Sequence, residues 1–275
     1  MDRRQFLKRC FQIGGYAAIA QLGMGAVEDA IGHGILPALI GGSGGNTWPT
    51  WGEEDESKIA SSNIVALSME NTSAGGNETG QGGGLSEADR TLTQVGGLAG
   101  ATGSPLMRQF DSGYWMTLTN TLAQFICSTT YTIIMKWNTV SDLWGTFFRI
   151  TEGAGDTILS IQHLNKILSV TTDASGTDSV ATAFTNTGNV YIVFQTDGGV
   201  HNGMLAWSVT KPTSFSAIPA GQKVDIGTSG DISGETAGGG GTQLLATDQA
   251  VWNANSQVTG KLQYLILSNT ALLTY

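Results

Sequence analysis

From residue 62 onward the sequence consists of short runs of β-branched and aromatic residues, and this pattern restricts the possible folds more than any other feature. Turn signals such as TDGG at 196–199 and HNG at 201–203 separate the runs, and no long amphipathic helix follows residue 31. Closely spaced strands without helical crossovers predict an all-β fold, namely an antiparallel β-sandwich or jelly roll. The runs interpreted as strands are 63–70, 114–119, 131–138, 144–151, 157–161, 167–171, 180–184, 189–196, 203–209 and 262–268.

Two of these runs also indicate which side chains should be buried. In 131–138 alternate residues are expected to share one face. The residues of that face are Tyr131, Ile133, Met135 and Trp137. In 189–196 both alternating sets contain apolar residues, with Val190, Ile192 and Phe194 opposite Tyr191, Val193 and Gln195. A strand that is apolar on both faces is expected to be covered on both sides, as in the interior of a sandwich.

The composition of the chain argues against one class of partner. Only 13% of the 275 residues are charged and the formal net charge is −9, although four of the 13 basic residues lie within the first nine positions. An acidic surface repels phosphate backbones, so we expect no binding of nucleic acid, and the simplest role of the acidity is solubility. Gly reaches 39 residues, and the two Gly-rich segments 71–84 and 227–243 are expected to be surface loops.

The first residues resemble a targeting signal. The segment DRRQFLK at 2–8 is similar to the twin-arginine export motif, with Arg3, Arg4, Phe6 and Leu7 at the motif positions. The apolar segment that follows is too short and too mildly hydrophobic to be a stable membrane span. The resemblance implies export of the folded protein to a periplasmic, cell-surface or extracellular location, with only transient membrane contact through this segment. The alternative is an amphipathic or surface helix that is never cleaved.

Three regions follow from these patterns. Residues 1–30 are interpreted as the twin-arginine-type signal segment. Residues 31–61 combine GGSGG, the Pro-containing WPTW and an acidic run at 53–56, which predicts a connector without a fold of its own. Residues 62–275 are interpreted as a single sandwich domain.

Five segments of residues 62–275 resemble, in the correct order, the signatures of laminin-G-like domains, which belong to the concanavalin A-like jelly rolls. They are NIVALSMENTSAGG (63–76), SPLMRQFDSGYWMTLTN (104–120), TYTIIMKWN (130–138), NVYIVFQTDGG (189–199) and TGKLQYLILSNTALLT (259–274). The resemblance implies a concanavalin A-like jelly roll and membership of a fold that includes lectins and glucanases.

Glucanases of this fold need two carboxylates on one strand, one as nucleophile and one as general acid. Their Glu-x-Asp-x-x-Glu pattern is absent from the sequence. The nearest pairs, Glu152 with Asp156 and Asp231 with Glu235, lie in segments that resemble turns or loops and do not alternate along a strand. We therefore assign no catalytic residue and expect a non-catalytic protein, with a glycoside hydrolase as an alternative.

A carbohydrate-binding site needs an aromatic platform for sugar rings and amides or carboxylates for hydroxyl groups. Trp252 lies in the polar segment ATDQAVWNANSQVTG beside Asn253 and Asn255, and Trp144 lies at a strand start after a turn. These four residues are the candidate carbohydrate-binding residues, and the alternative is that Trp252 caps an edge of the sandwich. The tryptophans within predicted strands are interpreted as core residues: Trp115, Trp137 and Trp207.

Laminin-G-like domains often hold calcium through loop carboxylates and carbonyls, so the resemblance implies a calcium ion as a candidate cofactor. Asp173 and Asp178 lie in one segment, TTDASGTDS, and Asp156 is the third candidate ligand. The alternative is a solvated polar turn without a metal.

The sequence therefore predicts an exported, non-catalytic module that binds carbohydrate or another cell-surface polymer through the loops of a jelly-roll sandwich. An alternative of a different class is a structural or adhesion protein, such as a virion or cell-surface component, that uses the sandwich for protein packing. Stabilisation by a glycan would favour the first, and self-assembly without glycan would favour the second.

Overall fold

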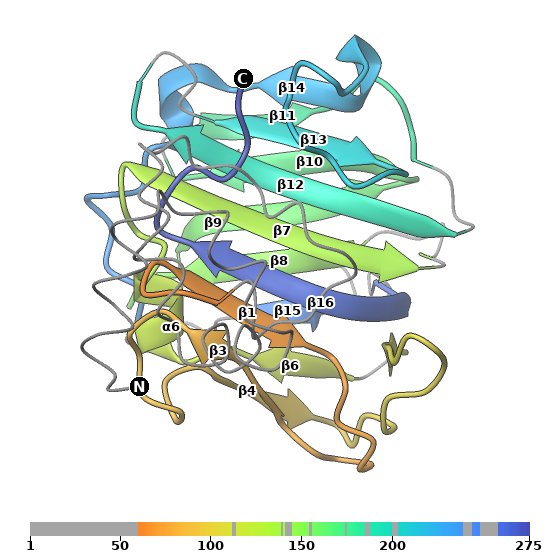
Figure 1. Ribbon diagram of the computed structural model, residues 1–275. Helices are drawn as coiled ribbons and strands as arrows, with labels where there is room; N and C mark the ends of the chain where they lie inside the picture. The colour runs from red at the N-terminus through yellow and green to blue at the C-terminus, as the bar shows by residue number, and fades with distance from the viewer. Residues whose placement is uncertain are drawn as a thin grey trace, which may run out of the picture. The chain divides into compact units, whose positions relative to one another are not determined.

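Two antiparallel β-sheets packed face to face form the described part of the chain (Figure 1). The computed structural model describes residues 60–111, 114–138, 140, 145–153, 156–173, 175–184, 188–199, 203–238, 244–247 and 258–275, all within one unit, Asn46–Tyr275. The signal segment predicted at 1–30, and all but the last two residues of the connector predicted at 31–61, lie outside these residues. Among the described residues, no helix is both long and apolar enough to span a membrane.

The sheet nearer the viewer in Figure 1 is here called the front sheet. Its strands are, in spatial order, β14 (Lys223–Asp225), β13 (Met204–Ser208), β12 (Asn189–Asp197), β7 (Thr130–Asn138), β16 (Gly260–Ser268), β1 (Ile64–Ser68) and β3 (Gln81–Gly82). An eighth strand, β5 (Arg108–Phe110), pairs with the beginning of β16.

The opposite sheet is here called the back sheet. Its strands are, in spatial order, β11 (Ser175–Ser179), β10 (Ile167–Thr172), β9 (Thr157–Leu164), β8 (Gly145–Thr151), β15 (Leu244–Thr247), β6 (Trp115–Thr117), β4 (Thr91–Val95) and β2 (Glu78–Thr79). The described helical segments are short: α6 (Asn120–Gln124) and the 3-10 turns η1 (Ala220–Gln222) and η2 (Gly227–Gly230). The hydroxyl of Thr119 caps α6 by accepting a hydrogen bond from the Leu122 N–H at 3.0 Å.

The strand order joins segments that lie far apart in the sequence. β7 lies between β12 and β16, with Ile134 opposite both Val193 and Ile266. β1, the first described strand, pairs with β16, the last one. Long connections between antiparallel neighbours are typical of jelly rolls. The antiparallel β-sandwich predicted from the sequence is confirmed.

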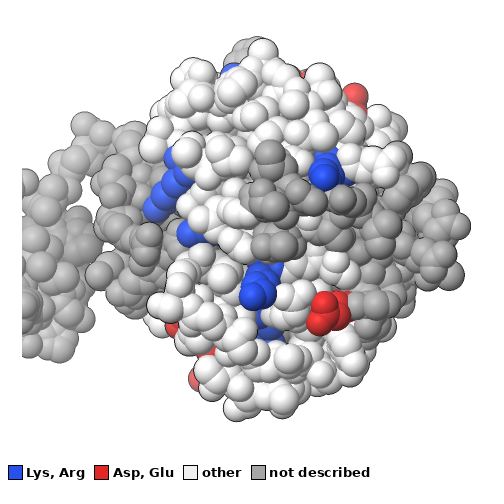
Figure 2. All heavy atoms as spheres, turned by 90° about the vertical axis from the view of Figure 1, so that its right-hand side faces the viewer, with Lys and Arg blue, Asp and Glu red and all other residues white. Residues whose placement is uncertain are grey.

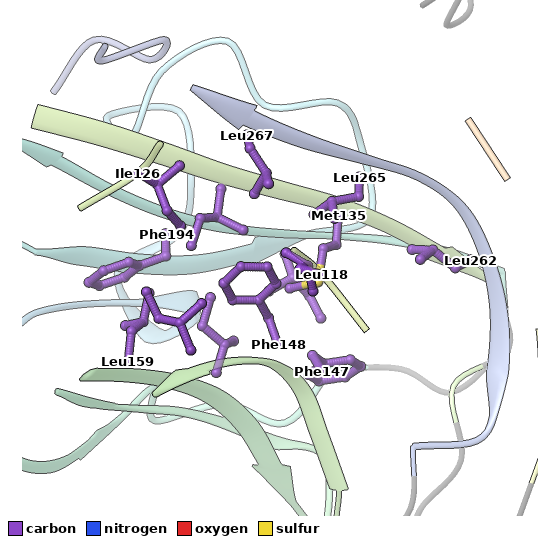
Figure 3. Close-up of a cluster of buried hydrophobic side chains, with 14 of the residues drawn as sticks. Leu118, Ile126, Met135, Phe147, Phe148, Leu159, Phe194, Leu262, Leu265 and Leu267 are labelled. Atoms are coloured by element: carbon purple, nitrogen blue, oxygen red, sulfur yellow. The ribbon is translucent and has the colours of Figure 1, made fainter. Parts of the chain in front are cut away.

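The main core fills the space between the two sheets (Figure 3). The four residues predicted to share the inner face of β7 are all fully buried there, so the predicted alternation is confirmed. Figure 3 shows Phe148 and Leu159 of the back sheet pointing into the same space as Met135 and Phe194 of the front sheet. Burial of one large apolar side chain stabilises a fold by about 1.5–3 kcal/mol, so this core holds the sheets in a rigid arrangement.

The outer face of the front sheet is also covered, as the two apolar sets of 189–196 predict. Tyr191 and Val193 are buried in a second apolar cluster that includes Leu272 and Leu273. Gln195 is fully buried on the same face, where its Oε1 accepts hydrogen bonds from the N–H groups of Leu272 and Leu273, both at 2.8 Å. Residues 270–275, here called the C-terminal strap, therefore lie across the front sheet.

The run 180–184 was expected to be a strand, and this expectation is wrong. Val180 and Phe184 are buried, but their N–H groups bond to Leu168 and Lys166 in an irregular segment. The run is apolar because it fills the core, and a core position does not require a strand ladder. The predicted runs also omit seven of the observed strands, most of them short or polar: β2, β3, β4, β5, β11, β14 and β15.

The Gly-rich segment 71–84 was expected to be a surface loop, but it contains β2 and β3. Gly82 has a φ of 89°, and a Cβ atom there would lie 2.1 Å from the carbonyl oxygen of Ile64. Glycine is required at this position because the backbone of β3 approaches β1 too closely for a side chain. The glycines of this segment therefore allow close strand packing in addition to turns.

Candidate functional site

The structure describes only some of the site residues predicted from the sequence. The predicted carbohydrate-binding residues Trp144, Trp252, Asn253 and Asn255 lie outside the described residues, as do the targeting residues Arg3, Arg4, Phe6 and Leu7. The assignment of these residues stays a prediction. Of the tryptophans interpreted as core, Trp137 and Trp207 are buried, whereas Trp115 is partly exposed on the outer face of the back sheet.

The three candidate calcium ligands lie on the back sheet. Asp156 precedes β9, where its carbonyl accepts a hydrogen bond from the N–H of Glu152 at 3.0 Å, and Asp173 follows β10 at the same end of the sheet. Asp178 lies opposite Val170, which is three residues before Asp173 in the sequence. Along the strands, Asp178 is therefore about 10 Å from Asp173. Among the described residues, no three His, Cys, Asp or Glu side chains form a group that could hold a metal ion.

One end of the sandwich gathers carboxylates from three separate loops. Glu152 forms a bridge with Ala237, which brings it close to Glu235 in the loop after η2. Burial, together with the nearby carboxylates of Asp173 and Glu152, raises the pKa of Glu235 above its ordinary value. These residues are here called the acidic end: Glu152, Asp173 and Glu235. The structure thus brings together one member from each of the two carboxylate pairs that the sequence presented separately.

A second feature lies on the outer face of the back sheet, at strands β6, β4 and β2. Trp115 lies opposite Val95, and Thr117 lies opposite Thr93. The alternate residues of these strands, Leu92 and Met116, are fully buried in the core, so the first set must face outward. Thr79 continues this surface from β2, opposite Thr91. We call these residues the Trp–Thr face: Trp115, Val95, Thr117, Thr93, Thr91 and Thr79.

Three of the four threonine hydroxyls of this face are held by hydrogen bonds, those of Thr79, Thr91 and Thr117. Thr91 Oγ1 donates to the carbonyl of Glu87 at 2.7 Å, and the hydroxyls of Thr79 and Thr91 are 3.0 Å apart. Thr117 Oγ1 donates to the carbonyl of Thr93 at 3.3 Å. Thr79 and Thr93 are exposed, whereas Trp115, Thr117 and Thr91 are partly exposed. An aromatic ring and a set of oriented hydroxyls therefore share one surface that is built on strands.

A buried ion pair lies beneath the Trp–Thr face and holds β2 in place. Arg108 is fully buried, and its Nη1 donates to Glu78 Oε1 at 2.5 Å. Glu78 also accepts hydrogen bonds from the N–H of Asn71 at 3.2 and 3.3 Å. Arg108 reaches two further backbone oxygens, those of Ala99 at 3.1 Å and Ser73 at 3.2 Å. Burial raises the pKa of Glu78 despite the opposing effect of Arg108.

The Trp–Thr face was missed at the level of sequence, although part of its signal is present there. Met116 and Leu118 alternate with Trp115 and Thr117 in the run 114–119, so the run could have been assigned an inner and an outer face. The threonines of β4 and β2 give no such signal, because they come from segments interpreted as loops or left unassigned. Their position beside Trp115 depends on strand pairing.

Comparison with solved structures gives distant similarities. Trypanosoma rangeli sialidase in complex with the inhibitor DANA is 13% identical, with 76% of this chain and 30% of that chain covered and a TM-score of 0.48. The binding domain of botulinum neurotoxin DC in complex with rat synaptotagmin II is 9% identical, with 77% and 49% covered and a TM-score of 0.49. Botulinum neurotoxin type C, from a study of its dependence on two ganglioside molecules for cell entry, is 7% identical, with 76% and 48% covered and a TM-score of 0.47.

This chain therefore spans less than half the length of these solved structures. No protein-family model and no curated protein matches it. At such low identity and TM-score the likenesses carry no argument about function. What the candidate surfaces can bind is therefore argued from the residues that form them.

Proposed function

We propose that this protein is an exported, non-catalytic module that binds carbohydrate, and that the Trp–Thr face is a binding surface. The observation that carries the proposal is Trp115, a partly exposed aromatic ring that lies on a sheet surface beside oriented threonine hydroxyls. Aromatic rings offer a large apolar area to the apolar face of a sugar ring, and a few placed polar groups orient the ligand.

The scaffold favours binding at this surface. The inner neighbours of the site, Leu92 and Met116, are fully buried, and the Glu78–Arg108 pair holds the edge strand. Side chains on a packed sheet lose little further freedom when a ligand binds, so less of the interaction energy is spent on ordering the site. The predicted loop site around Trp252 stays a second candidate for carbohydrate binding.

The proposal is tested by thermal unfolding of the full chain against a panel of polysaccharides and oligosaccharides. A ligand at about 100 times its dissociation constant should add about 2.7 kcal/mol to the free energy of unfolding. We expect one glycan class to raise the Tm, Trp115→Ala to abolish this rise, and Trp115→Phe to retain part of it. Thr177→Val, on the far edge of the same sheet face, is the control and should bind normally.

An unresponsive panel would contradict the proposal. Self-association of the chain without glycan would then favour the structural or adhesion role. A rise in Tm that survives Trp115→Ala but disappears in Trp252→Ala would move the binding site to the predicted loop.

The proposed export rests on the segment DRRQFLK at 2–8. In this proposal the signal contacts the membrane only during transport, and the sandwich domain folds before export. A disulfide-free sandwich fits this route, because its folding does not require an oxidising compartment.

A calcium ion at Asp156 and Asp173 stays a proposal. Calcium should raise the Tm of a chain treated with chelator, and Asp173→Asn should remove that rise. An identical Tm in calcium and in chelator would exclude a stabilising calcium site.

Glycan hydrolysis at the acidic end is a second candidate function. The observation that favours it is the raised pKa of Glu235 near the carboxylate of Glu152, because a general acid needs a raised pKa. We expect any release of reducing sugar to disappear in Glu235→Gln and in Glu152→Gln. Release that continues in both variants would exclude these carboxylates.

A further inference from the structure

We infer that the Trp–Thr face binds an extended, uncharged polysaccharide along β4 and β6 and does not bind anionic glycans. The inference rests on the proposed function of this face and adds the class of glycan. Three properties of the face support it: its length, its hydrogen-bonding character and the charges that surround it.

The face is longer than a single sugar contact requires. Thr91 and Val95 are four residues apart on β4, which corresponds to about 14 Å along the strand. Trp115 lies beside Val95 at one end, and Thr79 lies beside Thr91 at the other. A glycan stacked on Trp115 can therefore reach the threonines at the far end only if it continues as a chain along the strands.

Three of the four threonines of this face, namely Thr79, Thr91 and Thr117, offer acceptor oxygens to a ligand. Thr91 uses its hydroxyl proton for the carbonyl of Glu87, so the proton between Thr79 and Thr91 must come from Thr79. Thr117 uses its proton for the carbonyl of Thr93. The free lone pairs of these three oxygens can accept hydrogen bonds from sugar hydroxyls. A carboxylate or sulfate has no proton to give, so it would find few donors here.

The carboxylates next to the face repel anions. Glu87 is exposed, and its backbone carbonyl is the one that accepts the hydroxyl proton of Thr91. Asp89 lies two residues before Thr91, and hydrogen bonds from the hydroxyls of Ser86 and Thr121 lower its pKa. Asp89 is therefore negatively charged at neutral pH, and the exposed Glu87 is a second acidic side chain at this end. A glycan that carries carboxylates or sulfates would meet these charges at the end of the face formed by Thr91 and Thr79.

Two arginines on the strands and turns around the face, Arg90 and Arg149, donate to other partners. Arg90 donates from Nε to the carbonyl of Gly80 at 2.6 Å and from Nη1 to the carbonyl of Leu85 at 2.5 Å. Arg149 lies on the same outer face, two strands away from Thr117, because Leu244 of β15 pairs with both residues. Arg149 is only 9% exposed, and its Nη2 donates to Thr157 Oγ1 at 2.9 Å. Figure 2 shows another side of the molecule, where Lys, Arg, Asp and Glu side chains are few and scattered among uncharged residues.

The test compares neutral and anionic probes on the full chain by calorimetry. The neutral probes are cello- and manno-oligosaccharides from mono- to hexasaccharide, and the anionic probes are oligogalacturonate, heparin oligosaccharides and sialyllactose. We expect the affinity for one neutral series to rise with the length of the oligosaccharide. The affinity should change little between about 0.15 and 1 M salt, because the binding of an uncharged ligand depends little on a Debye length that falls from about 8 to about 3 Å over this range. We expect no binding of the anionic probes.

Variants locate the chain on the face. Trp115→Ala should abolish binding of every length, whereas Thr91→Val should weaken only the longer oligosaccharides, by about five- to tenfold. Thr177→Val is the matched control, because it removes a hydroxyl about 29 Å away on the same sheet face and should bind normally. Equal losses for short and long oligosaccharides in Thr91→Val would overturn the extended orientation.

The outcomes separate this inference from the proposed function. Salt-sensitive binding of an anionic probe that is lost in Trp115→Ala and in Arg149→Gln would overturn the inference and leave carbohydrate binding intact. Binding of no probe, neutral or anionic, would overturn the proposed function itself.

Discussion

Gln195 provides a direct test of how the C-terminal strap is held on the front sheet. Its Oε1 accepts hydrogen bonds from Thr132 Oγ1 at 2.9 Å and from the N–H groups of Leu272 and Leu273, and its Nε2 donates to the carbonyl of Leu273 at 2.7 Å. Gln195→Met keeps the approximate volume of the side chain and removes all of these bonds. The substitution therefore isolates hydrogen bonding from packing.

The expected loss follows from the groups left without partners. The N–H and the carbonyl of Leu273 would each be buried without the bond from residue 195, whereas the N–H of Leu272 retains Thr132 Oγ1 at 3.2 Å. A buried polar group left unsatisfied costs about 1–3 kcal/mol, so two such groups predict a loss of about 3 kcal/mol in the free energy of unfolding. For a domain of this size, that loss corresponds to a decrease of about 6–12 °C in Tm.

The assay is thermal and urea unfolding, combined with hydrogen exchange of residues 270–275. The strap should exchange faster in Gln195→Met, because its anchoring bonds are gone. Gln162→Met is the matched control, since Gln162 is partly exposed on β9 and the change should cost less than about 0.5 kcal/mol. A loss below about 1 kcal/mol in Gln195→Met, with unchanged exchange in the strap, would refute the reasoning.

Of four further predictions, two concern the edge strand, one the glycine packing and one export. Because burial raises the pKa of Glu78, the folded state holds the proton of Glu78 more tightly than the unfolded state does. The free energy of unfolding should therefore fall as the pH rises from the ordinary Glu pKa to the raised one. Glu78→Gln should flatten this pH dependence in urea unfolding, and an unchanged pH dependence would contradict the assignment. Arg108→Met should cost about 3–5 kcal/mol in the same assay, because it leaves the Glu78 carboxylate buried without its charge partner, and a loss within experimental error would count against a buried pair. Gly82→Ala should lower the Tm much more than Gly84→Ala, since both glycines have positive φ but only at Gly82 does backbone lie within 4 Å of the added Cβ; equal effects would show that φ alone matters. Replacing both Arg3 and Arg4 by Lys should leave the protein inside the cell in fractionation experiments, whereas Lys8→Arg should be exported normally, and export of the double variant would reject the twin-arginine assignment.

Local sequence patterns were sufficient to predict the strands at the centre of the sandwich. The runs around β7, β12 and β16 carry large apolar residues at period two, and strand geometry places alternate residues on opposite faces regardless of what they pair with. The same local rule could have placed Trp115 on an outer face, since its neighbours Met116 and Leu118 are the buried ones. The run 180–184 misled because an apolar composition reports burial, and an irregular segment can be buried as well as a strand.

The all-β class, the alternating faces of the central strands and the acidic, sparsely charged character of the chain follow from the sequence, because each depends on residue type and short-range spacing. The partners of those strands do not. Glu78 and Arg108 are 30 residues apart, Gln195 and Leu273 are 78 apart, and Trp115 meets Val95 through strand pairing. Such contacts depend on the order and register of strands in the completed sheets, where the free energy of burying the whole core selects one arrangement. The candidate binding face exists only in that arrangement, because its ring and its hydroxyls come from three strands that no local pattern brings together.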